Sequence, residues 1–200
     1  TTAIGVAISH GNGDSFERCG PRPILSYSLD EPFILSGPKI RQFNDRYYLF
    51  YVAGQKWVIV NGKPEMSLKI RMAISDDGLS WKKVNKNLIS DNALNESQAS
   101  PDVIFANGKY HMFFCNWDPA SFRNTKSRTI GYASSTDLIN WERDDSKSGI
   151  AVSKEKDAFD HETLAYPHVF QLKEKKYMLY LGNEVGRYGF GLAELNGELS

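Results

Sequence analysis

The segment Ser100–Phe114 reads SPDVIFANGKYHMFF, and similar segments lie on both sides of it in the chain. GPKIRQFNDRYYLFY (Gly37–Tyr51) precedes it and YPHVFQLKEKKYMLY (Tyr166–Tyr180) follows it, with prolines 63 and 66 residues apart. In each copy a strand-like run after the proline leads through a polar turn into an aromatic-rich run, a pattern typical of a β-hairpin. The sequence therefore repeats a hairpin about every 60 residues.

A second motif repeats in phase with this hairpin. It reads IGVAIS, IRMAIS, IGYASS and FGLAEL, starting at Ile4, Ile70, Ile130 and Phe190. A polar turn and a strand led by Trp81 or Trp141 follow the two central copies, and we expect both tryptophans in the cores of their units. Together the two motifs give four antiparallel strands per unit, which is the blade of a β-propeller.

We therefore predict an all-β fold, a β-propeller of four-stranded antiparallel blades within one domain over residues 1–200. The expected blades are 1–30 (partial), 38–97, 101–160 and 167–200 (partial). Each proline is expected at the first residue of an innermost strand, where proline is tolerated. No helix is predicted, because Gly, Asn, Asp and Pro interrupt the chain too often. About three and a half blades cannot close a ring, so we expect the remaining blades to come from a longer chain or from a partner.

The charge balance argues against two classes of partner. Basic and acidic residues number 24 each, so no strong field recruits nucleic acid or an anionic membrane, and no apolar run is long enough to span a bilayer. We expect no nucleic acid and no membrane partner. The N-terminus carries no export signal and Cys19 and Cys115 fall in different blades, which indicates reduced thiols and a cytoplasmic location. A mature exported protein would look the same.

Candidate catalytic residues lie where the innermost strands begin. ESQASPDV (Glu96–Val103) and ETLAYPHV (Glu162–Val169) share a pattern, and the innermost strands of a propeller line its central channel. Glu96 and Glu162 could supply the acid and the base of glycoside hydrolysis. Asp102 and His168 follow the two prolines, and Asp160 lies two residues before Glu162. Asp102 is a third catalytic candidate, and His168 and Asp160 are expected to bind the substrate. The competing interpretation, given equal weight, is that both glutamates accept backbone N–H bonds and hold their loops.

Three further residues are expected on the loops between the second and third strands of the blades: Trp57, Trp117 and Arg187. Aromatic faces stack on sugar rings, and Arg binds carboxylates or phosphates in a forked geometry. Packing or a solvated surface is the alternative for each. The chain has no HExxH or CxxC motif and its histidines lack metal-ligand spacing, so no metal site is predicted and no cofactor is required. The channel could nevertheless hold a divalent ion such as calcium.

The proline-led strands, the YYLFY-type second strand, the IxxAxS strand and the SDDGLSW turn (Ser75–Trp81) resemble the five-bladed propellers of the furanosidase superfamily. This superfamily includes glycoside hydrolase families 43, 32 and 68 and the related family 130 phosphorylases. The resemblance covers nearly the whole chain and implies a five-bladed ring with a carbohydrate ligand in the central funnel. Sialidases, another propeller family, have a similar turn with the pattern SxDxGx(S/T)W. In SDDGLSW the Gly directly follows the second Asp, so this chain does not match the sialidase pattern.

The chain departs from the superfamily at its catalytic positions. Families 43 and 32 place an Asp directly before the proline of early innermost strands, and a Glu two residues before a later one. In this chain the residues directly before the three prolines are Gly37, Ser100 and Tyr166. The residues two positions before the prolines are Ser36, Ala99 and Ala165, and none of the six is acidic. The chain is most similar to uncharacterised hydrolase-like propellers with a Glu five residues before the proline.

Three functions follow as expectations. The first is a glycoside hydrolase that acts in the central funnel through Glu96 and Glu162. The second is a non-catalytic glycan-binding or scaffolding propeller, which the missing acids favour. The third is a glycan phosphorylase, for which Arg187 is the candidate basic residue.

Overall fold

The structure is a computed structural model and describes residues 1–11, 13, 15–125 and 127–199. Its strands form four antiparallel sheets, which confirms the predicted all-β propeller fold of four-stranded blades. The first complete blade holds β3 (Leu35–Phe43), β4 (Arg46–Val60), β5 (Lys63–Ser75) and β6 (Lys82–Lys83). The second holds β7 (Ser97–Ala106), β8 (Lys109–Trp117), β9 (Thr129–Ser135) and β10 (Glu142–Arg143).

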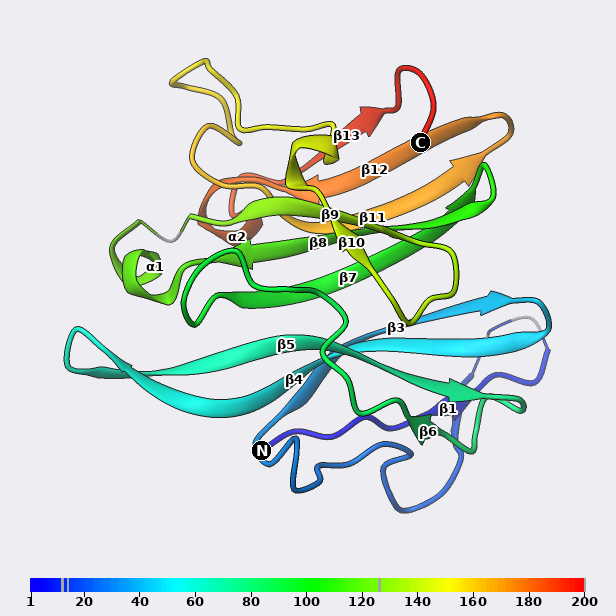
Figure 1. The fold of residues 1–200 in the computed structure, drawn as a ribbon. Coiled ribbons are helices and arrows are strands. Elements are labelled where there is room, and N and C mark those ends of the chain that lie inside the picture. Colours follow the sequence, from blue (N-terminus) through cyan, green and yellow to red (C-terminus); the bar gives the residue numbers. More distant parts are fainter. Residues whose placement is uncertain (12, 14, 126, 200) are drawn as a thin grey trace.

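Two smaller sheets flank these blades along the chain. The N-terminal one pairs β1 (Ala7–Ile8) with β2 (Glu17–Arg18), and the C-terminal one holds β11 (Ala165–Leu172), β12 (Lys175–Leu181) and β13 (Phe190–Glu194). Figure 1 shows the sheets following one another in chain order, from the blue N-terminal part to the red C-terminal end. We refer to the sheet of β11, β12 and β13 as the third blade.

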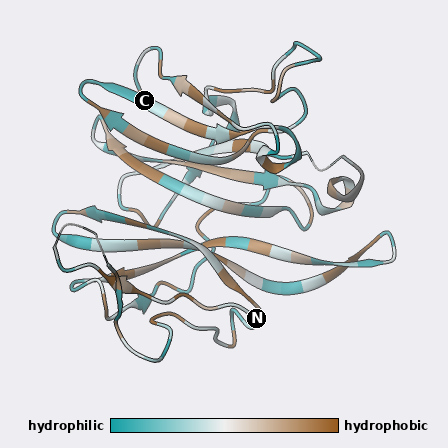
Figure 2. Cartoon of the chain, turned by 180° about the vertical axis from the view of Figure 1, so that it is seen from behind, coloured by the Kyte–Doolittle hydropathy of each residue, from teal (hydrophilic) through white to brown (hydrophobic). Residues whose placement is uncertain are grey.

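Neighbouring blades pack face to face, because each strand directs alternate side chains to opposite faces of its sheet. Phe50 and Met72 of the first blade share one buried cluster with Met112 and Phe114 of the second. The opposite face of the second blade packs on the third in another buried cluster, which includes Phe113, Tyr132, Val169 and Met178. Hydrophobic residues accordingly recur as separate brown bands along the strands in Figure 2.

The predicted core tryptophans pack against these clusters. Trp81 is partly buried against the N-terminal side of the first blade, and Trp141 lies between the first and second blades. Each indole nitrogen donates to a backbone oxygen three residues earlier, Gly78 O at 3.1 Å and Leu138 O at 2.9 Å. The expectation for both residues is confirmed.

The prolines of the innermost strands β3, β7 and β11 lie inside the strands, and the prediction that they begin them is wrong. Each strand starts before its proline, at Leu35, Ser97 or Ala165, and its pairing register shifts across the proline. A β-bulge leaves one residue outside the ladder, so the missing proline N–H costs no hydrogen bond there.

The connection between β4 and β5 is also shorter than expected. Both strands continue to a tight turn at Asn61–Gly62, where both residues have positive φ angles of 50° and 75°. Asn-Gly is the preferred pair for such a hairpin turn. The resulting long hairpin projects beyond the other blades on the left of Figure 1.

Short helices occupy loops for which no helix was predicted. Helix α1 (Pro119–Thr125) follows β8, the 3-10 helix η1 (Asp145–Lys147) follows β10, and α2 (Asn183–Gly186) follows β12. These segments are too short for helical periodicity to be visible in the sequence. Within the described ranges, no helix has the length and apolar character needed to cross a membrane.

Candidate functional site

The innermost strands of three blades bring together the residues that follow their prolines. Lys39, Asp102 and His168 occupy this position in β3, β7 and β11. His168 Nδ1 lies 2.7 Å from Asp102 Oδ2, and Lys39 Nζ lies 3.6 Å from the same oxygen and 3.0 Å from His168 Nδ1. Arg41, two residues after Lys39, also reaches Asp102, with Nη2 2.5 Å from Oδ1. We call Lys39, Arg41, Asp102 and His168 the inner cluster.

The bulges explain why these side chains can meet. The residue before each proline has a positive φ, 57° at Gly37, 51° at Ser100 and 54° at Tyr166. For residues other than glycine this conformation is strained, and such strain collects at functional sites. A bulge also redirects the side chains that follow it. The positions that carry catalytic acids in the resembling families thus have the same unusual backbone in all three blades.

Asp102 connects the three blades. Its side chain is fully buried, and it accepts hydrogen bonds from the backbone nitrogens of Val103 (3.0 Å) and Val169 (2.8 Å). Arg41 donates in addition to the backbone oxygens of the same two valines, at 2.9 and 3.2 Å. The predicted catalytic residue Asp102 is therefore enclosed by protein atoms, and its contacts toward solvent include His168 and Lys39, whose side chains are 41% and 30% exposed.

Glu96 is buried in an ion pair. Its Oε1 accepts from Arg143 Nη1 at 2.6 Å and from Gln98 Nε2 at 3.0 Å, and its Oε2 accepts from the backbone nitrogen of Asn92 at 3.2 Å. Burial opposes the charge of Arg143, but the hydrogen bonds that it donates to Asp145 and Glu96 outweigh this effect and raise the pKa of the guanidinium. These contacts agree with the loop-holding interpretation that the sequence left open for Glu96.

Glu162 differs from Glu96 in its burial and in its partners. Its side chain is 59% exposed, and its Oε1 lies 3.5 Å from His161 Nε2. Its backbone nitrogen donates to Asn183 Oδ1 at 2.8 Å, and its backbone oxygen accepts from Ser127 Oγ at 3.0 Å. The loop is thus fixed by its backbone while the carboxylate faces solvent. No contact joins Glu162 to Glu96 among the described residues.

Asp160, two residues before Glu162, is largely buried. Its Oδ2 accepts from Tyr180 Oη at 2.9 Å, and burial together with the carboxylate raises the pKa of Tyr180 to about 12. The predicted ligand-binding role of Asp160 stays a prediction.

The predicted aromatic and basic residues separate into two groups. Trp117 is the last residue of β8 and pairs with Ser97 of β7, so its predicted place in a loop is wrong. Its ring packs against Phe122 of α1, with Arg128 5.0 Å from the ring centre. Tyr166, the bulged residue before Pro167, stacks on Arg128 as well, at 5.6 Å. Trp117 and Tyr166 therefore stand beside the Glu162 loop, because Ser127 contacts Glu162 and precedes Arg128.

Trp57 and Arg187 lie apart from this group. Trp57 belongs to strand β4 and pairs with Met66 of β5, so its predicted place in a loop is wrong. The reason is the long β4–β5 hairpin. Arg187 is exposed and pairs with Glu184 at 2.9 Å. Its predicted role in ligand binding stays untested.

Sequence reasoning missed Lys39, Arg41, Arg128 and Tyr166. Lys39 carried a usable signal, because it occupies the same place after its proline as Asp102 and His168. Arg41 and Arg128 carried none, since their contacts join segments far apart in the sequence.

The inner cluster does not suit calcium. Calcium takes six to eight oxygen ligands, whereas this cluster holds one carboxylate among three basic side chains. Elsewhere in the described part of the chain, no group of three or more His, Cys, Asp or Glu side chains could hold a metal ion. Calcium in the channel stays a prediction.

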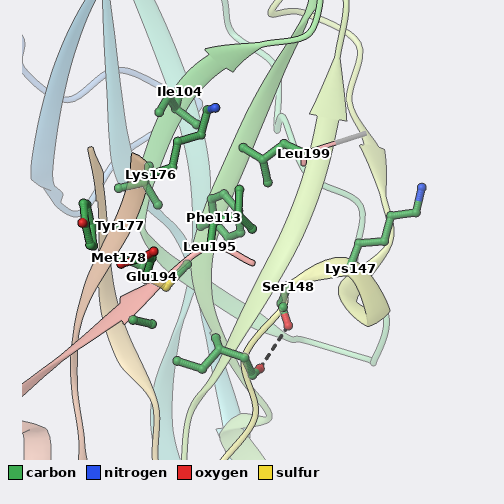
Figure 3. Close-up of a pocket in the computed structure, with 14 residues that line it drawn as sticks. Ile104, Phe113, Lys147, Ser148, Lys176, Tyr177, Met178, Glu194, Leu195 and Leu199 are labelled. Carbon is green, nitrogen blue, oxygen red and sulfur yellow. Dashed lines mark hydrogen bonds between the residues drawn. The ribbon is translucent and has the colours of Figure 1, made fainter. Parts of the chain in front are cut away.

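An apolar pocket lies away from these residues. It is formed between the second and third blades by side chains that include Ile104, Phe113, Met178 and Leu195 (Figure 3). None of the predicted site residues lines it. We interpret it as part of the packing between blades.

Comparison with known proteins yields relatives without a known function. No family model matches the chain. Two uncharacterised proteins of Mycobacterium tuberculosis, from the strains CDC 1551 and H37Rv, are each 36% identical to it over 193 residues. The match covers 96% of this chain and 60% of either relative, so the chain spans less than two thirds of their length.

Solved structures with this fold include glycoside hydrolases. One is described only as a glycoside hydrolase, with a TM-score of 0.72 and 19% identity over 97% of this chain and 57% of the other. A family 117 glycoside hydrolase from Zobellia galactanivorans has a TM-score of 0.68 and 19% identity, with 85% and 54% covered. Sucrose-6-phosphate hydrolase from Lactobacillus gasseri has a TM-score of 0.58 and 16% identity, with 82% and 31% covered. The chain therefore has a propeller fold that glycoside hydrolases share.

Proposed function

We propose that the protein is carbohydrate-active and acts as a glycoside hydrolase, with its sugar at the end of the central channel where β3, β7 and β11 begin. The observation that carries this proposal is the placement of the inner cluster, next to three equivalent bulges, in a fold shared with glycoside hydrolases. The complete ring is proposed to have five blades, supplied by a longer chain or a partner.

We assign the chemistry to Glu162 in preference to Glu96. An acid or base must exchange a proton with the substrate, and the Glu162 carboxylate is exposed whereas the Glu96 carboxylate is buried against Arg143. Glycoside hydrolysis requires two carboxylates on either side of the scissile bond. The second is proposed to come from the blades that complete the ring.

Trp117 and Tyr166 are proposed to bind the sugar ring. Their aromatic faces are held by Arg128, and Tyr166 is 42% exposed beside the Glu162 loop. Flat apolar faces of this kind stack on the C–H face of a sugar.

The test is hydrolysis of a panel of aryl glycosides by the full-length protein. We expect at least one to be cleaved, and Glu162→Gln to lower the rate by about 100-fold or more, since general acid–base catalysis contributes about 10²–10⁴-fold. Glu174→Gln is the matched control, because Glu174 is an exposed glutamate at the other end of the third blade. Full activity in Glu162→Gln would contradict the assignment.

A non-catalytic glycan-binding propeller is the second candidate. Two observations favour it: the residues before the prolines are Gly37, Ser100 and Tyr166, and Glu96 is held in an ion pair. Glycans that bind without being cleaved, with binding lost in Trp117→Ala, would support this candidate over the hydrolase.

A further inference from the structure

The inner cluster has more basic groups than its single carboxylate can pair with. Lys39, Arg41 and His168 surround Asp102, which is the only acidic side chain that contacts them in the part of the chain described here. Asp102 is fully buried, whereas the side chains of Lys39 and His168 are 30% and 41% exposed. The side of the cluster that faces the channel is therefore positive.

Asp102 has little hydrogen-bonding capacity left for Lys39. Its Oδ1 accepts from Arg41 and from the Val103 backbone nitrogen, and its Oδ2 accepts from the Val169 backbone nitrogen and contacts His168. A carboxylate oxygen offers about two lone-pair sites. Lys39 Nζ accordingly stands 3.6 Å from Oδ2, beyond hydrogen-bond distance.

His168 cannot take the place of that missing acceptor. Its Nδ1 is within reach of both Asp102 Oδ2 and Lys39 Nζ, but one ring nitrogen cannot donate to a carboxylate and accept from an ammonium at the same time. The shorter contact, 2.7 Å, is the one to the carboxylate, and a proton on Nδ1 satisfies it. Lys39, whose side chain is 30% exposed, is then left with N–H donors for which the described residues offer no acceptor.

Arg41 cannot serve a ligand in the same way. Its Nε donates to Val103 O, and its Nη2 donates to Asp102 and to Val169 O. The guanidinium is thus occupied in joining the three innermost strands, which leaves Lys39, with His168 beside it, as the group available to a ligand.

We propose that the carbohydrate bound at this site is anionic, and that Lys39 binds its carboxylate or phosphate group next to His168. This inference rests on the proposed carbohydrate function and narrows its substrate class. An ammonium with free donors in a partly enclosed channel binds an oxyanion through charge-assisted hydrogen bonds. The alternative is that Lys39 only balances the charge of Asp102, in which case its loss lowers stability and leaves ligand binding unchanged.

The experiment compares matched sugars on the full-length protein. The probes are glucuronate against glucose, galacturonate against galactose, glucose 6-phosphate, and inorganic phosphate, with dissociation constants from NMR titration. We expect an anionic sugar to bind about 10-fold or more tightly than its neutral counterpart. Glucuronate and galacturonate report on a carboxylate, and glucose 6-phosphate reports on a phosphate.

Three variants separate the ligand role from the structural one. We expect Lys39→Gln to remove the preference for the anionic sugar, and Lys39→Arg, which keeps the charge, to retain most of it. Lys173→Gln removes an exposed lysine from the β11–β12 turn and should change nothing. Unfolding midpoints of all three variants verify that they are folded.

The outcomes also separate this inference from the proposed function. If aryl glycosides are cleaved but neutral and anionic sugars bind equally, or if Lys39→Gln keeps the preference, the inference is wrong and the function stands. If no sugar is bound or cleaved, both are wrong. Binding of inorganic phosphate alone, without any sugar, overturns the assignment to an anionic carbohydrate.

Discussion

The glutamates that precede the innermost strands have different environments in successive blades. Glu31 and Glu96, before β3 and β7, are buried in ion pairs, whereas Glu162, before β11, exposes most of its carboxylate. The partners of the first two are Lys83 on β6 and Arg143 on β10. These two basic residues occupy equivalent positions, each two residues after the tryptophan that leads the fourth strand.

Glu31 and Glu96 make the same connection within their blades. In the first and second blades the glutamate joins the entry to the first strand to the last strand of the same sheet, so one ion pair holds both edges. In the described part of the third blade, the Glu162 carboxylate instead lies 3.5 Å from His161 Nε2. One repeat position therefore stabilises the first and second blades.

The largest effect is expected from Glu31→Gln. Glu31 is fully buried and accepts from Lys83, from Tyr51 Oη at 2.8 Å and from Arg71 Nη1 at 3.3 Å. Removal of its charge leaves two largely buried cations unpaired, and breaking a buried ion pair costs about 3–5 kcal/mol. Urea unfolding measures this loss. A loss below about 1 kcal/mol would show that Glu31 does not hold the blade together.

A smaller effect is expected from Glu96→Gln. Arg143 keeps its second carboxylate partner, Asp145, with Nη2 2.7 Å from Oδ2. The change therefore removes charge-assisted hydrogen bonds without isolating the cation, and such bonds contribute about 1.5–3 kcal/mol each. A double-mutant cycle with Arg143→Met isolates the pair. Additive effects of the two changes would contradict a direct coupling.

Much of this arrangement is visible in the sequence, because the repeat itself fixes strand order. The residues after Pro38, Pro101 and Pro167 had to be neighbours once the propeller was recognised, and Lys39 could have been identified from that argument. Arg143 could have been matched with Lys83 in the same way. The bulges were not predictable, because Ser100 and Tyr166 are not residues that favour positive φ.

Features outside the repeat were harder to predict. Trp57 was misplaced because the first blade extends its β4–β5 hairpin, although Asn61–Gly62 is a recognisable turn signal. Helix α1 and the cation–π contacts of Arg128 occur in one blade, so no repeated pattern announced them.

The stability of the protein in acid offers a third comparison between blades, in which a smaller effect is expected. Backbone N–H groups of Ser80 and Leu79 lower the pKa of Asp77, and the equivalent bonds from Asn140 and Ile139 lower that of Asp137. Gly197 has the matching place in the third blade. A folded-state pKa below the unfolded value gives stability that is present above about pH 4 and lost as the pH falls through the lower, folded pKa.

We therefore expect Asp137→Asn to reduce the acid dependence of unfolding. Unfolding at pH 2–4 should take up about one proton less per replaced aspartate, because linkage ties the slope of stability against pH to proton uptake. Urea unfolding at several pH values measures this slope. Asp157→Asn, at an exposed aspartate in the loop before β11, is the control, and an equal change in both variants would contradict the turn as the cause.

The smallest effect on stability is expected from Glu162→Gln, and this variant separates the two kinds of glutamate most directly. The carboxylate is exposed, and the loop is held by backbone bonds to Asn183 and Ser127 that the change leaves in place. Exposed ion pairs contribute little, so the unfolding free energy should change by less than about 0.5 kcal/mol. Glu162→Gln would then lose glycosidase activity at full stability, whereas Glu31→Gln and Glu96→Gln lose stability first. A loss of stability comparable to that of Glu96→Gln would show that Glu162 has the same structural role as its counterparts, and the catalytic assignment would lose its basis.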